Sequence, residues 1–213
     1  MTGQPIMAAV LGTAAQVAAA AAAQPSWADL ARTVRGCTAC AELAATRTQV
    51  VPGVLPAAAR LLCVGEAPGA QEDAEGVPFV GRGGRLLDEL LGQVGLDRST
   101  VAVANVLKCR PPDNRKPARA ESAACRPWLL RQIELADPAL VLALGLTAAQ
   151  WALGPGVRLA GARGRVHLFD GRPLVVTYHP SAALRFGPGG APRAALLAGK
   201  GSPRSAAVTG RTW

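Results

Sequence analysis

Four short apolar runs recur along this chain, with segments of helical length between them. The runs occupy residues 60–64, 101–106, 139–144 and 173–178 and consist largely of Leu, Val and Ala. Runs of this length and composition predict buried β-strands. Strands that alternate with helices form parallel βαβ units covered by helices on both faces. The sequence therefore predicts an α/β fold, a three-layer α/β/α sandwich with a central four-stranded parallel sheet.

Residues able to form a site stand at the ends of these runs. Glu66, Asn105, Gly145 and His179 lie at or just after the four strand ends. Open α/β sheets bind ligands at the carboxyl ends of their strands, so we expect these residues to share one rim. The first strand leads into residues 65–69, GEAPG, whose two glycines and proline predict a sharp turn that a ligand can approach closely.

Length and local composition divide the chain into three parts. A chain of 213 residues is long enough for one domain with a sizeable core. We expect this domain at residues 26–198, after an Ala-rich leader at residues 1–25 that is helical or disordered. Residues 199–213 turn to Gly, Ser, Pro and Arg and are expected to form a disordered tail.

The chain is strongly basic, with a formal net charge of +9 from 23 Lys and Arg against 14 Asp and Glu. This excess favours a polyanionic partner such as nucleic acid, although a GC-rich coding sequence also enriches Arg. No uninterrupted apolar run reaches the roughly 20 residues that span a bilayer, so no membrane association is expected. The chain begins without the basic segment of a signal peptide, and we expect a cytoplasmic protein.

Four of the five cysteines form a candidate metal-binding set. Cys37 and Cys40 are a C-x2-C pair, and Cys109 and Cys125 follow far downstream. In a reducing compartment such clusters indicate metal binding or catalysis more often than disulfides. Four thiolates hold either a tetrahedral zinc ion or a [4Fe–4S] cluster, and spacing does not separate the two. Cys63 lies within the first apolar run and is expected to be a small core residue.

Together these residues resemble the family 4, or iron–sulfur, uracil-DNA glycosylases of the uracil-DNA glycosylase superfamily, over residues 31–186. The likeness rests on GEAPGAQED at residues 65–73, GVPFVG at 76–81, NVLKCRPP at 105–112 and HPSA at 179–182. It implies a monofunctional base-excision repair enzyme that hydrolyses the N-glycosidic bond of deoxyuridine in DNA and leaves an abasic site. It also implies a [4Fe–4S] cluster on Cys37, Cys40, Cys109 and Cys125.

The resemblance also assigns roles at the strand ends. It implies that Phe79 stacks on an extruded uracil, that Asn105 reads the Watson–Crick edge of the base, and that His179 donates to uracil O2. Glu66 would position water or polarise the site. The turn residues would contact base and phosphate through their backbone; these are Gly65, Ala67, Pro68 and Gly69. Such roles are physically sensible because a base inside a duplex must be flipped out before an enzyme can reach it.

Contacts to the DNA strand are expected from basic residues beside the site. We expect phosphate contacts from Arg110, Arg115, Lys116 and Arg185, and we assign the same role to Lys108. Leu184 and Arg185 follow His179 and are candidates for the wedge that fills the vacated base stack. An equally simple interpretation of these two is the start of a helix that packs on the sheet.

The expected partner is uracil-containing DNA, bound by a monomer. A related branch of the superfamily forms a covalent link to its product through a His in the loop after the second strand. That loop, residues 112–117, contains no His here, so we expect turnover without covalent trapping. The alternative is a non-catalytic, metal-stapled DNA-binding protein, which would bind DNA without preferring uracil.

Overall fold

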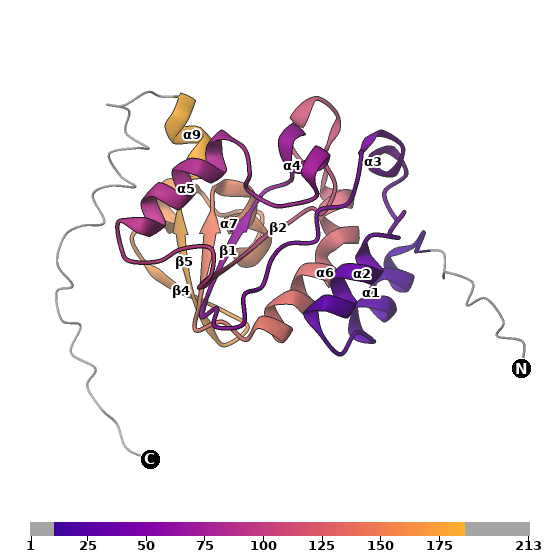
Figure 1. The fold of residues 1–213 in the computed structure, drawn as a ribbon, viewed down its shortest axis with the longest axis horizontal. Helices are drawn as coiled ribbons and strands as arrows, with labels where there is room; N and C mark the ends of the chain where they lie inside the picture. Colours follow the sequence, from indigo (N-terminus) through magenta and orange to yellow (C-terminus); the bar gives the residue numbers. More distant parts are fainter. Residues whose placement is uncertain (1–10, 186–213) are drawn as a thin grey trace, which may run out of the picture.

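A five-stranded sheet forms the centre of the computed structural model, which describes residues 11–185 (Figure 1). Its strands are β1 (Leu61–Gly65), β2 (Val101–Asn105), β3 (Leu140–Leu144), β4 (Val166–Phe169) and β5 (Arg172–Thr177), in the order β2-β1-β3-β5-β4. The first four in this order are parallel and coincide with the four predicted runs. The predicted α/β/α class is confirmed.

The strand count differs from the prediction because β4 adds an antiparallel edge to the four parallel strands. β4 and β5 are joined by Asp170 and Gly171, which both have positive φ, 50° and 73°. Two successive residues of this kind form the tight turn that suits a two-residue hairpin. The sequence of residues 161–169 predicts a turn and a short edge hairpin, and in the structure residues 166–169 form the edge strand β4 with β5 as its partner.

Helices cover both faces of the sheet (Figure 1). In chain order they are α1 (Ala14–Ala22), α2 (Trp27–Val34), α3 (Ala41–Thr46), α4 (Ala70–Glu75), α5 (Arg82–Gly92), α6 (Arg119–Ala136), α7 (Leu146–Leu153), α8 (Leu159–Ala162) and α9 (Pro180–Arg185), with a 3-10 turn at Pro112–Asn114. None of the helices described is long and apolar enough to cross a membrane.

Successive side chains of β1 pack on opposite faces of the sheet. Leu62 and Val64 point to the side of α6, α7 and α8, whereas Cys63 packs on the opposite side with Leu87 of α5. Successive strand side chains point to opposite faces, so an apolar run without alternation is buried on both. Cys63 is fully buried, which confirms its predicted place in the core.

The N-terminal helices pack beside the sheet domain, against α6 (Figure 1). Val17 and Ala21 of α1 and Leu30 of α2 are buried in one cluster with Trp128 of α6. Ser26 caps α2 by accepting a hydrogen bond from the Asp29 amide at 3.1 Å. The domain boundary at residue 26 stays a prediction, but the helical part of the Ala-rich segment packs as part of the core. The tail at residues 199–213 lies outside the described residues.

The strand order determines where a ligand can bind. The chain passes from β1 to β2 on one side and then crosses to β3 on the other side of β1. Such a switch point opens a crevice at the carboxyl ends of the strands. All four parallel strands end at that edge, so the loops that follow them surround one place.

Candidate active site

A pocket of about 630 Å³ opens at the carboxyl edge of the sheet. Its volume is in the range of small-molecule sites. The predicted residues that line it come from the connections after β1 and β5 and from the end of β2, and are Glu66, Ala67, Pro68, Gly69, Phe79, Asn105 and His179. Gly145, the strand-end residue after β3, lines the pocket as well. The structure thus brings together side chains that are up to 113 positions apart in the sequence, from Glu66 to His179.

Gly65 lies at the point where two of these side chains converge. A Cβ atom at this position would come within 2.4 Å of Asn105 Oδ1 and 2.5 Å of the Phe79 ring. Only glycine leaves room for both groups. The predicted close approach at this turn therefore serves the packing of Asn105 and Phe79.

Asn105 presents an unused hydrogen-bond acceptor. Its residue ends β2 opposite Gly65 and is only 3 % exposed. The side-chain oxygen Oδ1 is buried and has no hydrogen-bond partner within residues 11–185. A buried acceptor without a donor costs about 1–3 kcal/mol, so a ligand that donates here gains affinity.

The His179 side chain is held in one tautomer. The Ser181 amide donates to Nδ1 at 3.2 Å, and the Ser181 hydroxyl lies 2.8 Å from the same nitrogen. A backbone amide can only donate, so Nδ1 is an acceptor and the proton of the neutral ring is on Nε2. Burial, reinforced by the positive charge of Arg185 and opposed by Glu72, lowers the pKa of His179 to about 4. His179 is therefore a neutral donor at pH 7.

Phe79 and His179 form one wall of aromatic rings. Their ring centroids are 5.6 Å apart and their planes are inclined by 25°. Phe79 is buried, and its backbone has a φ of 57°, in the left-handed region. A base that stacks on Phe79 lies within reach of the His179 ring.

Glu66 is oriented by a residue that the sequence analysis does not include. The Thr147 hydroxyl, near the start of α7, donates to Glu66 Oε2. Thr147 follows the end of β3 by three residues. This position just past a strand end is the sequence feature that could have identified it as a site residue. This contact fixes the carboxylate at the mouth of the first loop.

The basic rim of the pocket is only partly as predicted. Arg115, Lys116 and Arg185 line the pocket, and Arg110 and Leu184 do not. Arg115 donates to Glu121 at 2.6 Å and to Glu42 at 2.8 Å, so its charge is already paired. Arg82 also lines the pocket, although the sequence analysis does not include it.

Lys108 is buried and is not available for a phosphate contact, which corrects the sequence interpretation. Its side chain is 1 % exposed and donates from Nζ to the Asn105 carbonyl at 2.7 Å. Burial lowers its pKa to about 8, while the nearby Cys125 and Cys109 act to raise it. An exposed basic loop was expected here, but the residues after β2 turn inward before the chain reaches the surface.

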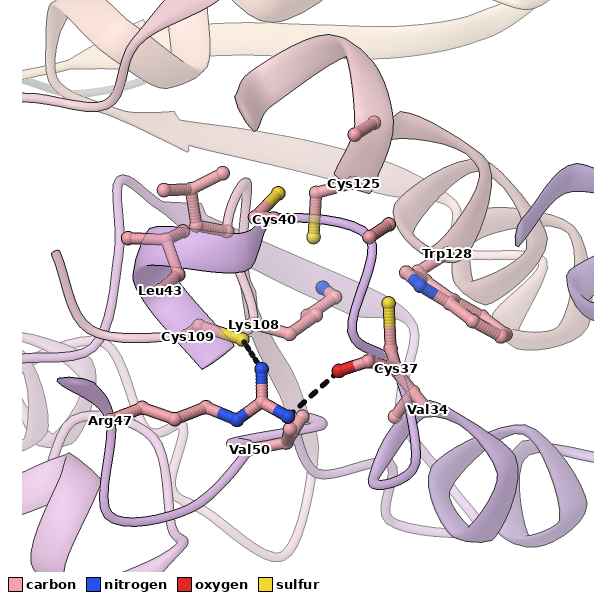
Figure 2. A pocket seen from close by; sticks show the side chains of 13 residues that line it. Val34, Cys37, Cys40, Leu43, Arg47, Val50, Lys108, Cys109, Cys125 and Trp128 are labelled. Atoms are coloured by element: carbon pink, nitrogen blue, oxygen red, sulfur yellow. Dashed lines mark hydrogen bonds between the residues drawn. The ribbon is translucent and has the colours of Figure 1, made fainter. Parts of the chain in front are cut away.

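The four predicted cysteines line a second cavity (Figure 2). Cys37 follows α2, Cys40 caps α3, Cys109 follows β2 and Cys125 lies in α6. Arg47 donates to Cys109 Sγ at 3.2 Å and to the Cys37 carbonyl at 2.7 Å. Burial raises the pKa of Cys125 to about 12 and, together with the neighbouring Cys109 and Cys37, that of Cys40 to about 11.

The four thiols in this cavity are the donor set of two kinds of metal site. In the described part of the chain, no three His, Cys, Asp or Glu side chains gather closely enough to hold a single ion. A tetrahedral zinc ion draws four sulfurs to about 2.3 Å from one point. A cubane cluster takes one thiolate at each of four irons, so its ligands surround a larger volume.

Comparisons with known proteins agree with one another. The profile of the "Uracil DNA glycosylase superfamily" matches residues 52–197. A Thermotoga maritima protein named type-4 uracil-DNA glycosylase is 46% identical over 154 residues, covering 71% of this chain and 80% of that protein. Proteins of the same name from Archaeoglobus fulgidus and Pyrobaculum aerophilum are 40% and 42% identical. The first alignment covers 73% of this chain and 82% of the relative, the second 71% and 81%.

Proposed function

This chain belongs to the uracil DNA glycosylase superfamily, and on that premise we propose that it is a type-4 uracil-DNA glycosylase. It hydrolyses the N-glycosidic bond of deoxyuridine in DNA, releases uracil and leaves an abasic site. The observation that carries this assignment to the pocket is the buried Oδ1 of Asn105, which lies beside Phe79 and His179 and has no hydrogen-bond partner among the described residues.

The Asn105 side chain matches the edge of uracil. Its Oδ1 accepts from N3–H, and its amide group donates to O4. Cytosine presents the opposite polarity at both positions, which would leave buried groups unpaired. The base reaches Asn105 only when it is extruded from the helix, and Phe79 offers the ring on which a flipped base stacks.

His179 supplies the charge stabilisation that bond cleavage requires. When the bond between C1′ and N1 breaks, its electron pair stays on uracil and the sugar becomes oxocarbenium-like. The Nε2–H group of neutral His179 donates to uracil O2, where negative charge accumulates in the transition state. Glu66, held by Thr147, orients the water that adds to C1′ and accepts its proton.

We propose that Cys37, Cys40, Cys109 and Cys125 hold a [4Fe–4S] cluster. Four thiols from three segments of the chain line one cavity, and this supports the proposal. The resemblance to the iron–sulfur uracil-DNA glycosylases favours the cluster over a zinc ion. The buried indole Nε1 of Trp128 lines the same cavity without a partner among the described residues, and a cluster sulfur would accept from it. When bound, the cluster supplies a structural cross-link.

The exposed cations at the mouth of the pocket suit the DNA backbone. Lys116, Arg185 and Arg82 line the pocket and are on the surface. They are positioned to contact phosphates next to the flipped nucleotide. Arg115 is a weaker candidate because it is already paired with Glu121 and Glu42.

Excision from a defined oligonucleotide tests the assignment. Anaerobically purified protein is incubated with DNA containing one uracil, and with the same DNA containing cytosine or thymine, followed by hot alkali. We expect strand breaks only at uracil. Asn105→Ala and His179→Ala should each lower kcat by about 10²- to 10³-fold.

His167→Ala is the matched control for the second histidine. His167 lies in β4, and its Nε2 is 2.7 Å from the Ala162 carbonyl, outside the pocket. Its replacement should leave excision unchanged. Protein that binds DNA in a salt-dependent manner but leaves uracil in place would overturn the assignment and favour a non-catalytic DNA-binding protein.

A further inference from the structure

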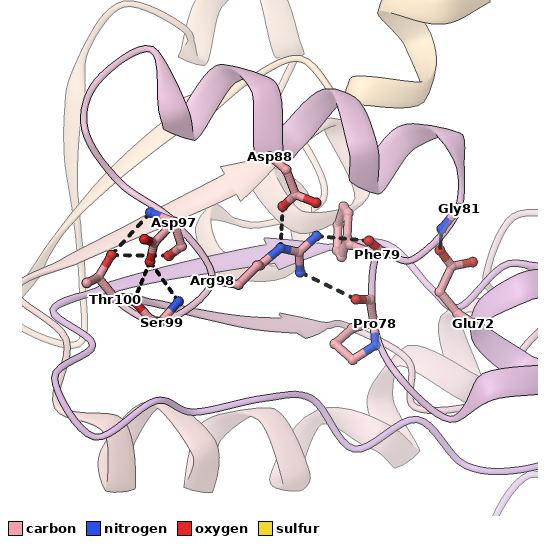
Figure 3. A network of polar contacts seen from close by, with 9 residues as sticks. All are labelled: Glu72, Pro78, Phe79, Gly81, Asp88, Asp97, Arg98, Ser99 and Thr100. Carbon is pink, nitrogen blue, oxygen red and sulfur yellow. Dashed lines mark hydrogen bonds and ion pairs between the residues drawn. The ribbon is translucent and has the colours of Figure 1, made fainter.

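Arg98 contacts the backbone of the base-stacking residue from outside the pocket (Figure 3). It lies in the connection between α5 and β2. Its Nη2 donates to the Phe79 carbonyl at 2.8 Å, and its Nη1 donates to the Pro78 carbonyl at 3.4 Å. Its Nε pairs with the Asp88 carboxylate of α5. One guanidinium thus ties the Phe79 segment to a helix.

The Phe79 backbone needs such support. Its φ of 57° is a conformation that a bulky side chain rarely adopts. Residues of this kind persist where their surroundings fix them, and they concentrate at ligand-binding sites. The ring direction follows from the backbone, so a relaxed φ would turn Phe79 away from His179 and the base.

The Phe79 carbonyl is confined on two sides. A Cβ atom on Gly84 would lie 1.7 Å from this oxygen, so the first turn of α5 packs directly against it. Arg98 donates to the same oxygen. Farther along the segment, the Gly81 amide donates to Glu72 Oε1 at 2.8 Å. Of these contacts, the one made by Arg98 is a hydrogen bond to the strained residue itself.

We propose that Arg98 is a positioning residue for base stacking, which holds Phe79 in its left-handed conformation so that the ring faces the flipped uracil. This inference rests on the proposed glycosylase function. Arginine suits the task because its planar fork makes three directed contacts at once. Lysine carries its three donors on one nitrogen and does not span the separated acceptors on Pro78, Phe79 and Asp88 as the planar fork does.

A double-mutant cycle tests the inference. Arg98→Met and Phe79→Ala are made singly and together, and kcat/KM is measured on uracil-containing DNA at a temperature where every variant is folded. Loss of a base–aromatic stack lowers binding by about 10- to 100-fold, so we expect that loss for Phe79→Ala. Arg98→Met should lower kcat/KM by about tenfold alone and by less than about twofold when Phe79 is already Ala.

Two further readouts separate positioning from general stability. Stacking exists before and during cleavage, so the loss should appear mainly in KM, and inhibition by free uracil should weaken by the same factor. Arg98→Lys, which keeps a cation beside Asp88, should behave like Arg98→Met and provides the same cycle if the Met variant does not fold. Arg172→Met is the matched control, because Arg172 pairs with Asp137 and Asp170 at the opposite end of β5 from the pocket.

The outcomes distinguish this inference from the proposed function. Equal losses for Arg98→Met with and without the Phe79 ring would show a merely structural role and overturn the inference alone. Arg98→Lys with wild-type KM would do the same. A wild-type chain that leaves uracil in DNA would overturn the function and the inference together.

Discussion

At the scale of single residues, the chemistry depends on which atoms are left without partners. His179 uses Nδ1 to accept from Ser181, which leaves Nε2–H for a ligand. Asn105 is held through its backbone carbonyl by Lys108 and keeps Oδ1 free. His179 is held through one ring nitrogen and Asn105 through its backbone, and each presents one side-chain group to a ligand, the arrangement that preorganised recognition requires.

The depressed pKa of His179 predicts how stability depends on pH. Above pH 6.5 the ring is neutral in both the folded and unfolded states, so its full contribution is present. As pH falls from 6.5 towards the folded-state pKa of about 4, only the unfolded state takes up the proton, and stability is lost. Because the ring is partly exposed, the loss is at most about 3 kcal/mol.

Urea unfolding at several pH values measures this effect. The free energy of unfolding of the wild type should fall more steeply between pH 6.5 and pH 4 than that of His179→Gln. The excision rate at saturating substrate should also stay level from pH 6 to pH 8, because the donor does not titrate there. Parallel stability curves for the two proteins, or an acid limb near pH 6.5 that His179→Gln abolishes, would contradict a depressed pKa.

The residues of the site divide by how visible they are in sequence. Glu66, Asn105 and His179 could be predicted because each follows a recognisable strand, and parallel strands end at one edge. Arg98 could not, since it acts through backbone carbonyls and has no motif of its own. Thr147 offered only its position just past the end of β3. Lys108 was misassigned because a lysine beside prolines and arginines is usually exposed.

At the scale of elements, the packing of α5 affects the geometry of the site. Gly84 in its first turn touches the Phe79 carbonyl, whereas an ideal Cβ on Gly92, its last residue, meets nothing within 4 Å. Alanine favours helix more than glycine does, by about 1 kcal/mol. The same substitution should therefore have opposite effects at the two ends of one helix.

Gly84→Ala should destabilise the protein by about 1–3 kcal/mol, the usual range for overpacking, and should impair excision by displacing Phe79. Gly92→Ala should leave excision unchanged and stability equal or slightly higher. Thermal unfolding together with excision assays measures both. A Gly84→Ala protein with wild-type stability and activity would show that the contact between α5 and Phe79 has no role.

The elements themselves were largely predictable. The four parallel strands coincide with the apolar runs of the sequence, and α5, α6 and α7 lie in the helix-length segments between them. The short α4 is absent from the sequence prediction because its sequence, AQEDAE, has no apolar stripe. The packing of α1 was also hidden, since an Ala-rich helix presents no face that stands out from the others.

At the scale of the whole molecule, the cysteine cavity connects the N-terminal helices to the sheet domain. Its lining unites α2, α3, the segment after β2 and α6. A cluster held there would cross-link all four. Metal sites of this kind contribute directly to folding free energy.

Loss of the cluster should therefore loosen the N-terminal third. Cys125→Ser should be colourless, unfold at a lower temperature, and be cut by protease first within residues 11–50. Cys63→Ala is the control, because Cys63 lies in β1 away from the cavity, and this variant should keep its visible absorption. A Cys125→Ser protein with unchanged unfolding temperature and cleavage pattern would show that the cavity does not bind these segments together.

The position of the pocket and its chemistry depend on different parts of the molecule. The position is set by the switch point between β1 and β3. This position follows from the topology of the chain and is shared by every sequence with the same topology. The chemistry of the pocket depends on a few side chains at strand ends, and none of these holds the sheet together. Substitutions at the strand ends can therefore change the base that is bound, or the reaction, during evolution while the sheet stays unchanged.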